Sequence, residues 1–432
     1  MQTAADLLLT NVSLPDGRRV DITVEEGFVA HTGAPRRADR TIDCTGLIVM
    51  PAGVDLHVHM RGGVQRGKED WESGSMSAIA GGVTVVVDQP NTIPPLTTPA
   101  AITGRVAEAL SHSRCHFALN GGAGQGVDLA ELWRSGVMAF GELFAAPSSY
   151  GVPLEPGMLG DILAEIRLLG ARATIHAEEV LPGRAGTLPE HHKARSPAGE
   201  YRAVLDVHRE NRAGTPLHFC HLSTAGAVKA AAGATVEVAP HHLLLSLEQF
   251  DPEDTHAKVN PPVRPDRERR LLRACWKRID LIASDHAPHS LQDKDAPFAD
   301  APSGIPGVET MVPLLMAGVL NRRFTRASVM DKTCYRPADC IGIPRAGYDP
   351  GNRADFALYP RRCTRIDADL LHSRARWTPY EGYEAVFPII VVMGGQIVFE
   401  EGQFFRGEPR WFHGKGYIKD RAKDDRADRA HP

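Results

Sequence analysis

Between residues 53 and 286 the sequence repeatedly alternates short apolar segments, typical of β-strands, with segments typical of helices. This alternation favours an α/β protein with a parallel sheet. Eight strands over about 235 residues are close to what a TIM-type (β/α)8 barrel requires. A doubly wound sheet is the alternative, but it would want a Gly-x-Gly-x-x-Gly turn after the first strand, and none is present there. The predicted strands are GVDLHVH (53–59), GVTVVVDQ (82–89), CHFALN (115–120), GVMAFGEL (136–143), RATIHAE (172–178), PLHFCHLS (216–223), ATVEVAP (234–240) and IDLIASDH (279–286).

The two ends of the chain have a different pattern. Residues 1–50 and 350–415 contain short alternating segments separated by glycine, proline and aspartate, which is typical of β-sheet. Because chain termini often lie close together, we expect both stretches to form one small β-sandwich beside a barrel at residues 51–349. Residues 416–432 are charged and almost without apolar side chains, so we expect a surface tail there.

The composition narrows the range of partners. A net charge of -4 gives no reason to expect nucleic acid or a membrane surface as a partner, and no apolar stretch approaches the roughly 18 residues of a membrane span. The first residues lack the basic segment of a signal peptide. Seven scattered cysteines without a Cys-x-x-Cys pair indicate reduced thiols in the cytoplasm. A homo-oligomer is compatible with the sequence.

The segment PAGVDLHVHM, residues 51–60, carries the first chemical signal. Apolar residues at positions 54, 56 and 58 alternate with Asp55, His57 and His59, so a strand would place the three polar side chains on one face. Two imidazoles at a strand end can bind a single metal ion. A structural histidine pair is the simpler explanation for an isolated His-x-His. Further donors elsewhere in the chain are therefore needed to favour a metal site.

The carboxyl ends of the other predicted strands supply further donors. In a barrel these ends meet at one face, where catalytic residues lie. Nitrogen and oxygen donors suit one or two divalent ions of the zinc type. His218 competes with His221, which we prefer because it lies nearer the end of its strand. Read in chain order, the strand ends give His57, His59, Glu142, His176, His221 and Asp285.

Longer motifs resemble the amidohydrolase superfamily. They run from residue 51 to about residue 310, and within the cyclic amidase branch they are most similar to the dihydroorotases. The resemblance implies a TIM-type barrel flanked by a β-sandwich and a metal-dependent hydrolysis of a cyclic amide. The matching segments are DLHVHMR, KEDWESGSMSAIAGGVTVVVDQPNT, IHAEE, HLSTAGA, VEVAPHHLL, KVNPPVR, SDHAPH and GIPGVET.

The resemblance also implies a site for dihydroorotate. Arg61, Asn91 and His289 would hold its carboxylate, and Asn260 would help to position its ring. An arginine fork together with amide and imidazole donors suits a planar carboxylate. Allantoinases and hydantoinases generally carry other residues at the positions of Asn91 and Asn260, so both asparagines favour dihydroorotate as the substrate.

Two departures from the family pattern concern the same site. Many members bridge two metal ions with a carboxylated lysine on the fourth strand, but no lysine occurs between Lys68 and Lys193. Two adjacent dications need bridging anions, and we expect Glu142 and a hydroxide to supply them. If Glu142 points elsewhere, the site is mononuclear or weakly occupied at its second position. Arg61 is followed by GGVQRG where dihydroorotases usually have an acidic residue and Pro-Gly, which leaves the choice among cyclic amides open.

The expected reaction is the reversible hydrolysis of dihydroorotate to N-carbamoyl-L-aspartate, a step of pyrimidine biosynthesis. A metal ion lowers the pKa of water, and Asp285 would accept the proton and pass it to the leaving ring nitrogen. A cyclic amidase of the hydantoinase, dihydropyrimidinase or imidase type would share the metals and Asp285 but differ at the carboxylate site. A catalytically silent scaffold is the other alternative; such relatives lose metal ligands, whereas this chain keeps all six.

Two polar, proline-containing segments follow strand ends and carry Asn260 and His289. They are KVNPPVRPDRERR, residues 258–270, and HSLQDKDAPFADAPSG, residues 289–304. Each is either a mobile cover over the site or an ordinary surface loop.

Overall fold

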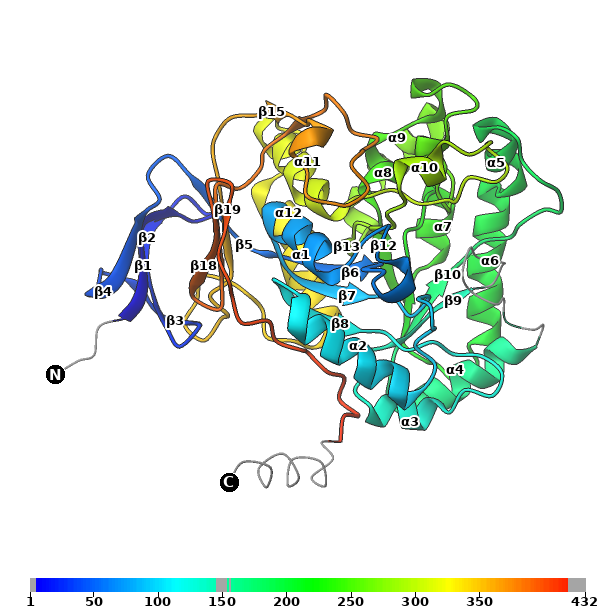
Figure 1. The fold of residues 1–432 in the computed structure, drawn as a ribbon, viewed down its shortest axis with the longest axis horizontal. Coiled ribbons are helices and arrows are strands. Elements are labelled where there is room, and N and C mark those ends of the chain that lie inside the picture. The colour runs from blue at the N-terminus through cyan, green and yellow to red at the C-terminus, as the bar shows by residue number, and fades with distance from the viewer. Residues whose placement is uncertain (1–4, 145–153, 155–156, 419–432) are drawn as a thin grey trace.

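The computed structural model of the protein describes residues 5–144, 154 and 157–418, so nearly all of the predicted tail at 416–432 lies outside the described residues. Parallel strands and helices alternate through the middle of the chain (Figure 1). The parallel strands form two sheets, with the orders β6-β7-β8 and β13-β12-β11-β10-β9. Their bounds are β6 Gly53–Val58, β7 Val83–Asp88, β8 His116–Leu119, β9 Phe140–Phe144, β10 Ala173–His176, β11 Leu217–Phe219, β12 Thr235–Val238 and β13 Leu281–Ile282.

Backbone pairing connects these two sheets at both of their edges. Beyond β8, Gly121 pairs in parallel with Phe140 of β9. At the opposite edge, Val58 of β6 pairs in parallel with His286, which lies just after β13, and the His59 amide donates to the His286 carbonyl at 2.8 Å. The carboxyl ends of all these strands therefore point toward the same side of the molecule.

Helices occupy the connections between the strands, and local sequence explains where they begin. Helix α1 starts after Asp70, whose side chain accepts a hydrogen bond from the Ser73 amide at 3.0 Å in a capping box. The helices are α1 Trp71–Ala80, α2 Pro99–His112, α3 Leu129–Arg134, α4 Met158–Leu168, α5 Leu188–Ala194, α6 Pro197–Glu210, α7 Ala225–Ala230, α8 Pro240–Leu244, α9 Asp266–Ala274, α10 Leu291–Lys294, α11 Val308–Leu320, α12 Arg326–Met330 and α13 Arg336–Ile341.

The two ends of the chain form β-structure to one side of the parallel sheets (Figure 1). One four-stranded sheet has the order β3-β2-β1-β4 and comes from N-terminal residues alone. A five-stranded sheet, β19-β18-β17-β14-β5, joins β5 to strands from beyond residue 355 through antiparallel pairing of β5 with β14. Their bounds are β1 Ala5–Ser13, β2 Arg19–Glu25, β3 Phe28–Gly33, β4 Ala38–Asp43, β5 Ile48–Pro51, β14 Phe356–Tyr359, β17 Ile390–Met393, β18 Gln396–Glu400 and β19 Gln403–Phe404; β15 Thr364–Arg365 and β16 Glu384–Ala385 form a separate pair.

After β19 the chain returns to the parallel sheets. Phe117 of β8 pairs with Trp411, and its amide donates to the Arg410 carbonyl at 3.0 Å. The stretch around Trp411 therefore packs along β8 rather than on the sheets formed by the chain ends.

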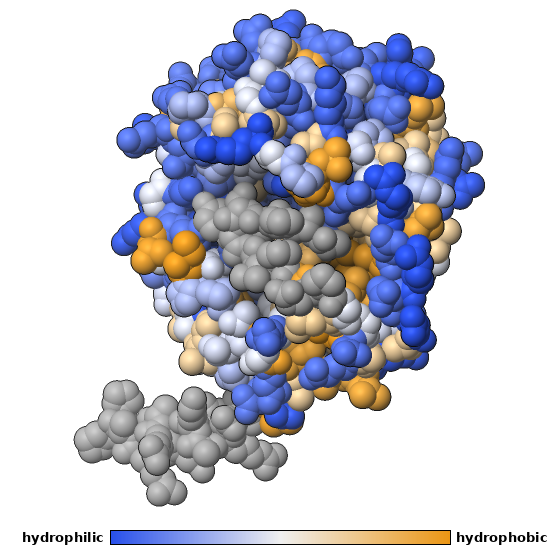
Figure 2. Space-filling model, turned by 90° about the vertical axis from the view of Figure 1, so that its right-hand side faces the viewer, coloured by the Kyte–Doolittle hydropathy of each residue, from blue (hydrophilic) through white to orange (hydrophobic). Residues whose placement is uncertain are grey.

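The described residues show no large hydrophobic patch on the face that Figure 2 presents. The face that carries α5 and α6 is mainly hydrophilic, and its exposed hydrophobic residues lie in small separate groups (Figure 2). No helix among the described residues combines the length and apolar character needed to cross a membrane.

All seven cysteines lie within the described part of the chain, and none of them forms a disulfide.

Candidate active site

The six predicted metal donors converge at the carboxyl ends of the parallel strands. His57 lies on β6, Glu142 on β9 and His176 at the end of β10. The other three, His59, His221 and Asp285, follow β6, β11 and β13 within three residues. All six side chains are buried, so the polar groups must satisfy one another or bind a ligand.

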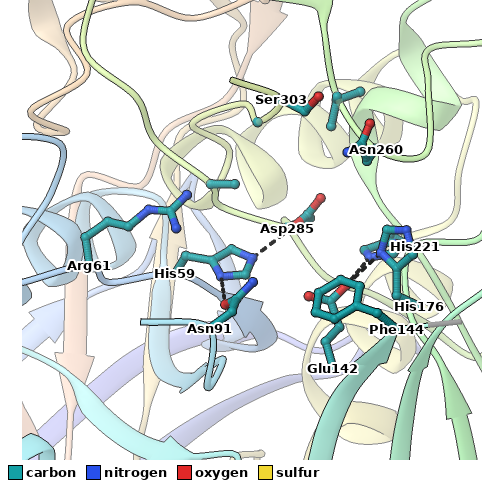
Figure 3. A pocket seen from close by; sticks show the side chains of 13 residues that line it. His59, Arg61, Asn91, Glu142, Phe144, His176, His221, Asn260, Asp285 and Ser303 are labelled. Carbon is teal, nitrogen blue, oxygen red and sulfur yellow. Dashed lines mark hydrogen bonds and ion pairs between the residues drawn. The ribbon is translucent and has the colours of Figure 1, made fainter. Parts of the chain in front are cut away.

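Glu142 lies at the centre of one half of this cluster. Its Oε1 atom is 3.0 Å from His176 Nδ1 and 2.7 Å from His221 Nε2 (Figure 3). Its Oε2 atom is 3.5 Å from His57 Nε2. The carboxylate therefore points into the cluster and faces three imidazoles from three different strands.

Asp285 closes the other half of the cluster. Its Oδ1 atom is 3.4 Å from His59 Nε2 and 3.6 Å from His57 Nε2. His57 Nε2 thus lies between the two carboxylates and belongs to both halves.

The donor set fits a divalent cation. The sets His57–His59–Asp285 and His57–Glu142–His221 each bring one ligand atom per residue within 4.8 Å of the others. Among the described residues, His57 Nε2 is buried without a hydrogen-bond partner, so it is available to a cation bound between the two carboxylates. Imidazole and carboxylate donors in this number suit one or two ions.

Charges within the cluster also favour a cation. Burial alone would raise the pKa of Glu142, but His57 and the hydrogen bonds from His176 and His221 hold it well below its usual range. Burial would likewise raise the pKa of Asp285, yet His59 and His57 lower it. For His57, burial opposes the charged form, but Glu142 and Glu237 raise its pKa well above the ordinary value. Both carboxylates are therefore anionic and attract positive charge.

Glu237 of β12 is a functional residue that the sequence analysis did not identify. Its side chain is fully buried and accepts hydrogen bonds from His57 Nδ1 at 3.1 Å, from His218 Nε2 at 2.9 Å and from the His221 amide at 2.9 Å. It orients the ring of the predicted donor His57 from behind, as buried carboxylates commonly do for metal-binding imidazoles, and it holds the backbone of His221. His218 therefore faces Glu237 rather than the cluster, which agrees with the preference for His221. A lone glutamate inside the apolar segment ATVEVAP is the sequence signal that points to Glu237.

Two more donors are oriented in the same way. His59 Nδ1 donates to Asn91 Oδ1 at 2.8 Å, and His176 Nε2 donates to Glu178 at 2.7 Å. With these outer nitrogens protonated, His59 Nε2 and His176 Nδ1 are left to bind a metal. Burial opposes the charged form of His176, but bonds to Glu142 and Glu178 raise its pKa to about 10, so a metal bound at Nδ1 would displace a proton.

Three site residues adopt backbone conformations that residues other than glycine rarely adopt. The φ angles of Arg61, His221 and Asp285 are 50°, 34° and 48°. Such left-handed conformations persist where surrounding contacts impose them, and they cluster at functional sites. The turns that follow the strands therefore direct these three side chains.

Gly141 has a φ of 125° and allows β9 to place Glu142, because a Cβ atom there would overlap with the Thr174 carbonyl oxygen on β10. We expect Gly141→Ala to lower the free energy of unfolding by about 2 kcal/mol or more and to reduce the metal content. Denaturant unfolding and metal analysis of the purified variant measure both effects. Gly126→Ala is the matched control, because Gly126 also has a positive φ but has open space around it. Equal stability losses in the two variants would contradict the steric argument.

A pocket opens above the donors. Figure 3 shows Arg61, His59 and Asn91 on one side, Glu142, Phe144, His176 and His221 on the other, and Asp285 between them. Because Asn91 Oδ1 accepts from His59, the amide NH2 group of Asn91 is the donor left for a ligand. The full lining is His59, Arg61, Asn91, Glu142, Phe144, His176, His221, Val259, Asn260, Asp285, Ala287, Ser303 and Gly304.

His289 is the one predicted substrate residue that does not line this pocket. Its Nδ1 atom is 3.1 Å from Lys68 Nζ, and its Nε2 atom is 3.1 Å from the Ser303 carbonyl oxygen. Burial and then the charges of Arg61 and Lys68 hold the pKa of His289 well below its usual range. The imidazole is therefore neutral, with its single proton on Nε2 and directed at Ser303.

Comparisons with known proteins agree with this geometry. No family model matches the chain. The solved structure of an L-hydantoinase (dihydropyrimidinase) from Arthrobacter aurescens superimposes with a TM-score of 0.87 at 26% identity, covering 94% of this chain and 99% of that one. The fold and the donor set together define the protein as a cyclic amide hydrolase.

Sequence relatives narrow this class further. A dihydroorotase from Methanosarcina acetivorans is 38% identical over 417 residues, which cover 89% of both chains. One from Halobacterium salinarum is 36% identical over 411 residues, covering 91% of this chain and 96% of the relative. The chain belongs to the dihydroorotase family.

Proposed function

We propose that the protein is a dihydroorotase, which catalyses the reversible hydrolysis of dihydroorotate to N-carbamoyl-L-aspartate in pyrimidine biosynthesis. The observation that carries the proposal is the position of Arg61 and Asn91 in the pocket directly beside the six buried donors. A guanidinium and an amide next to a cation-binding cluster suit a cyclic amide that also bears a carboxylate.

We assign His57, His59, His176, His221, Glu142 and Asp285 as ligands of one or, preferably, two zinc ions, with Glu142 between them. Bound cations would supply positive charge that acidifies water and polarises the ring carbonyl. The chain itself supplies the anionic Glu142 between three imidazoles, which offsets the repulsion between two dications.

The proton transfers are assigned to Asp285. Its lowered pKa keeps it ionised before the reaction, so it accepts the proton of the attacking water and then delivers that proton to the ring nitrogen as the amide bond breaks. In ring closure the same carboxylate takes the proton from the carbamoyl nitrogen. Its place among the pocket-lining residues puts it within reach of a bound ring.

Substrate binding is assigned to three other residues that line the pocket. Arg61 and the amide NH2 of Asn91 would hold the carboxylate, and Asn260 would position the ring. His289 was predicted to share the carboxylate, but its Nε2 proton is directed at the Ser303 carbonyl. That predicted contact therefore requires His289 to exchange its hydrogen-bond partner when substrate binds.

We also propose that the two parallel sheets form one eight-stranded (β/α)8 barrel, on the strength of the pairing at both of their edges. The sheets from residues 1–50 and 350–415 would form the separate β-sandwich, with residues 51–349 as the catalytic domain. Seven unpaired cysteines support a cytoplasmic location.

The proposed function is tested by comparing hydrolysis of dihydroorotate with hydrolysis of an uncharged hydantoin by the zinc-loaded protein. We expect dihydroorotate to have the higher kcat/KM, because only dihydroorotate offers a carboxylate to Arg61. A higher kcat/KM for the hydantoin would favour the hydantoinase alternative, and no turnover of either compound would favour a silent scaffold.

Replacement of Arg61 gives a sharper prediction. We expect Arg61→Gln to raise the KM for dihydroorotate by about 10- to 100-fold, since a charge-assisted hydrogen bond contributes roughly 1.5–3 kcal/mol, and to leave metal content unchanged. Arg66→Gln is the control, because Arg66 lies on the same loop but is exposed. Steady-state kinetics measures the effect, and an unchanged KM in Arg61→Gln would remove Arg61 from the site.

A further inference from the structure

Two loop segments form the wall of the pocket opposite strand β9. Their pocket-lining residues lie outside the helices and strands. Val259 and Asn260 come from the first, which follows a short 3-10 turn, Thr255–Ala257. Ser303 and Gly304 come from the second, which follows α10. These are the two polar segments for which the sequence suggests either a mobile cover or a surface loop.

Lys294, at the end of α10, ties the two segments together. Only 1% of its surface is exposed. Its Nζ atom donates to the carbonyl oxygens of Thr255 at 2.9 Å, Lys258 at 3.2 Å and Pro302 at 2.9 Å. Three carbonyls match the three N–H groups of an ammonium, and they come from both segments, so one side chain fixes the distance between them.

Lys258 makes the reciprocal connection from the first segment. Its Nζ atom donates to the carbonyl oxygens of Phe298 at 2.5 Å and Ala301 at 2.6 Å, and its own carbonyl accepts from the Gly304 amide at 3.0 Å. The backbone that carries Asn260 is therefore bonded directly to the backbone that carries Gly304.

This arrangement places two positive charges in the interior at a considerable free-energy cost. Burial lowers the pKa of Lys294 to about 7 and that of Lys258 to about 8. Among the described residues, neither ammonium forms an ion pair with a carboxylate. Both are stabilised by backbone carbonyl oxygens, and the ring of Phe298 faces Lys258 while the ring of Trp377 faces Lys294. An apolar side chain of similar length would fill the same space with less desolvation. What the ammoniums add is the fixed geometry of the two segments.

We propose that Lys258 and Lys294 are positioning residues that clamp the 255–260 and 298–304 segments and so place Asn260 and the Ser303–Gly304 wall against the bound substrate. This inference rests on the proposed function for the identity of the substrate. The clamp itself is a property of the two loops and is measurable without any substrate.

The test compares Lys294→Met and Lys258→Met with Lys332→Met. Lys332 is also buried and donates to a backbone carbonyl, that of Ile279, but it lies outside the pocket. Lys332→Met therefore reports the effect of removing a buried ammonium as such. Lys294→Arg keeps the charge and several donors and serves as the conservative variant.

We expect Lys294→Met and Lys258→Met to raise the KM for dihydroorotate by about 10-fold while kcat changes by less than about threefold and metal content stays constant. Lys294→Arg should recover part of the lost affinity, and Lys332→Met should leave KM unchanged. Hydrogen exchange of the zinc-loaded proteins should be faster in both segments for the two clamp variants only.

The possible outcomes separate the two proposals. A wild-type protein that does not turn over dihydroorotate would overturn the proposed function, and the exchange rates would still decide on the clamp. Unchanged exchange in both clamp variants, or a KM increase matched by Lys332→Met, would overturn the clamp and leave the dihydroorotase assignment intact. If one clamp variant fails to fold, the other carries the same comparison.

Discussion

Asp285→Asn is expected to lower kcat for dihydroorotate hydrolysis by about 10³-fold, within the range that general acid–base catalysis contributes. The amide cannot accept the proton of the attacking water or deliver one to the ring nitrogen. Its oxygen can still face His57 and His59, and the other five donors are unchanged, so the metal should remain bound. Steady-state kinetics in both directions, together with metal analysis, measures this separation of turnover from metal binding.

Asp280→Asn is the matched control for that result. Asp280 lies one residue before the same strand, β13, and accepts a hydrogen bond from the Val236 amide at 2.9 Å, at the end of the strand opposite the site. Its replacement should leave kcat near the wild-type value. Near wild-type turnover in Asp285→Asn would eliminate the assigned role, and loss of metal in that variant would contradict the expected separation of turnover from metal binding.

Glu142→Gln has the second large expected effect. The substitution keeps the shape of the side chain but removes the negative charge that lies within 3.5 Å of nitrogen atoms of His57, His176 and His221. Without that charge, the repulsion between two dications is no longer offset. We expect at least half of the bound metal to be lost and kcat to fall by about 10²-fold or more, as measured by metal analysis and kinetics on the same preparations.

A buried carboxylate elsewhere controls for the loss of charge in the interior. Glu309 on α11 is 5% exposed and accepts from His372, away from the pocket, and Glu309→Gln should retain both metal and activity. Full metal occupancy in Glu142→Gln would mean that Glu142 does not bridge, and the bound metal would then require a different set of ligands.

The sequence contained enough information to predict that the six side chains assigned as ligands lie at strand ends, because their signals are local. Strand periodicity placed His57, Glu142 and His176 on strands that the structure contains, and the following turns carry His221 and Asp285. The strands themselves are shorter than predicted: β11 spans three residues and β13 two. Apolar periodicity continues past the last ladder hydrogen bond, since a residue can face a buried side without being paired.

The strict alternation expected at residues 54–58 is also interrupted. Val54 and Leu56 pack in one apolar cluster and Val58 in another, and the pairing of β6 with β7 is irregular between Asp55 and Val58. Every residue of β6 is buried, so apolar identity alone could not reveal which side each residue faces.

Contacts between distant parts of the chain could not be predicted from the sequence. Glu237 lies 180 residues from His57, and His289 lies 221 residues from Lys68. No local pattern encodes either pair, because both depend on which strand ends and loops the fold brings together. The burial of Lys258 and Lys294 could not be predicted either, because lysine in a polar segment is ordinarily exposed.

The most direct test of the account is a crystal structure of the protein grown with zinc and soaked with N-carbamoyl-L-aspartate, with anomalous data collected at the zinc edge. We expect zinc at about 2.0–2.2 Å from nitrogen and oxygen atoms of the six donors, with a carboxylate of the ligand against Arg61 and Asn91. Anomalous density away from His57 and Asp285, or a ligand that avoids Arg61, would contradict it.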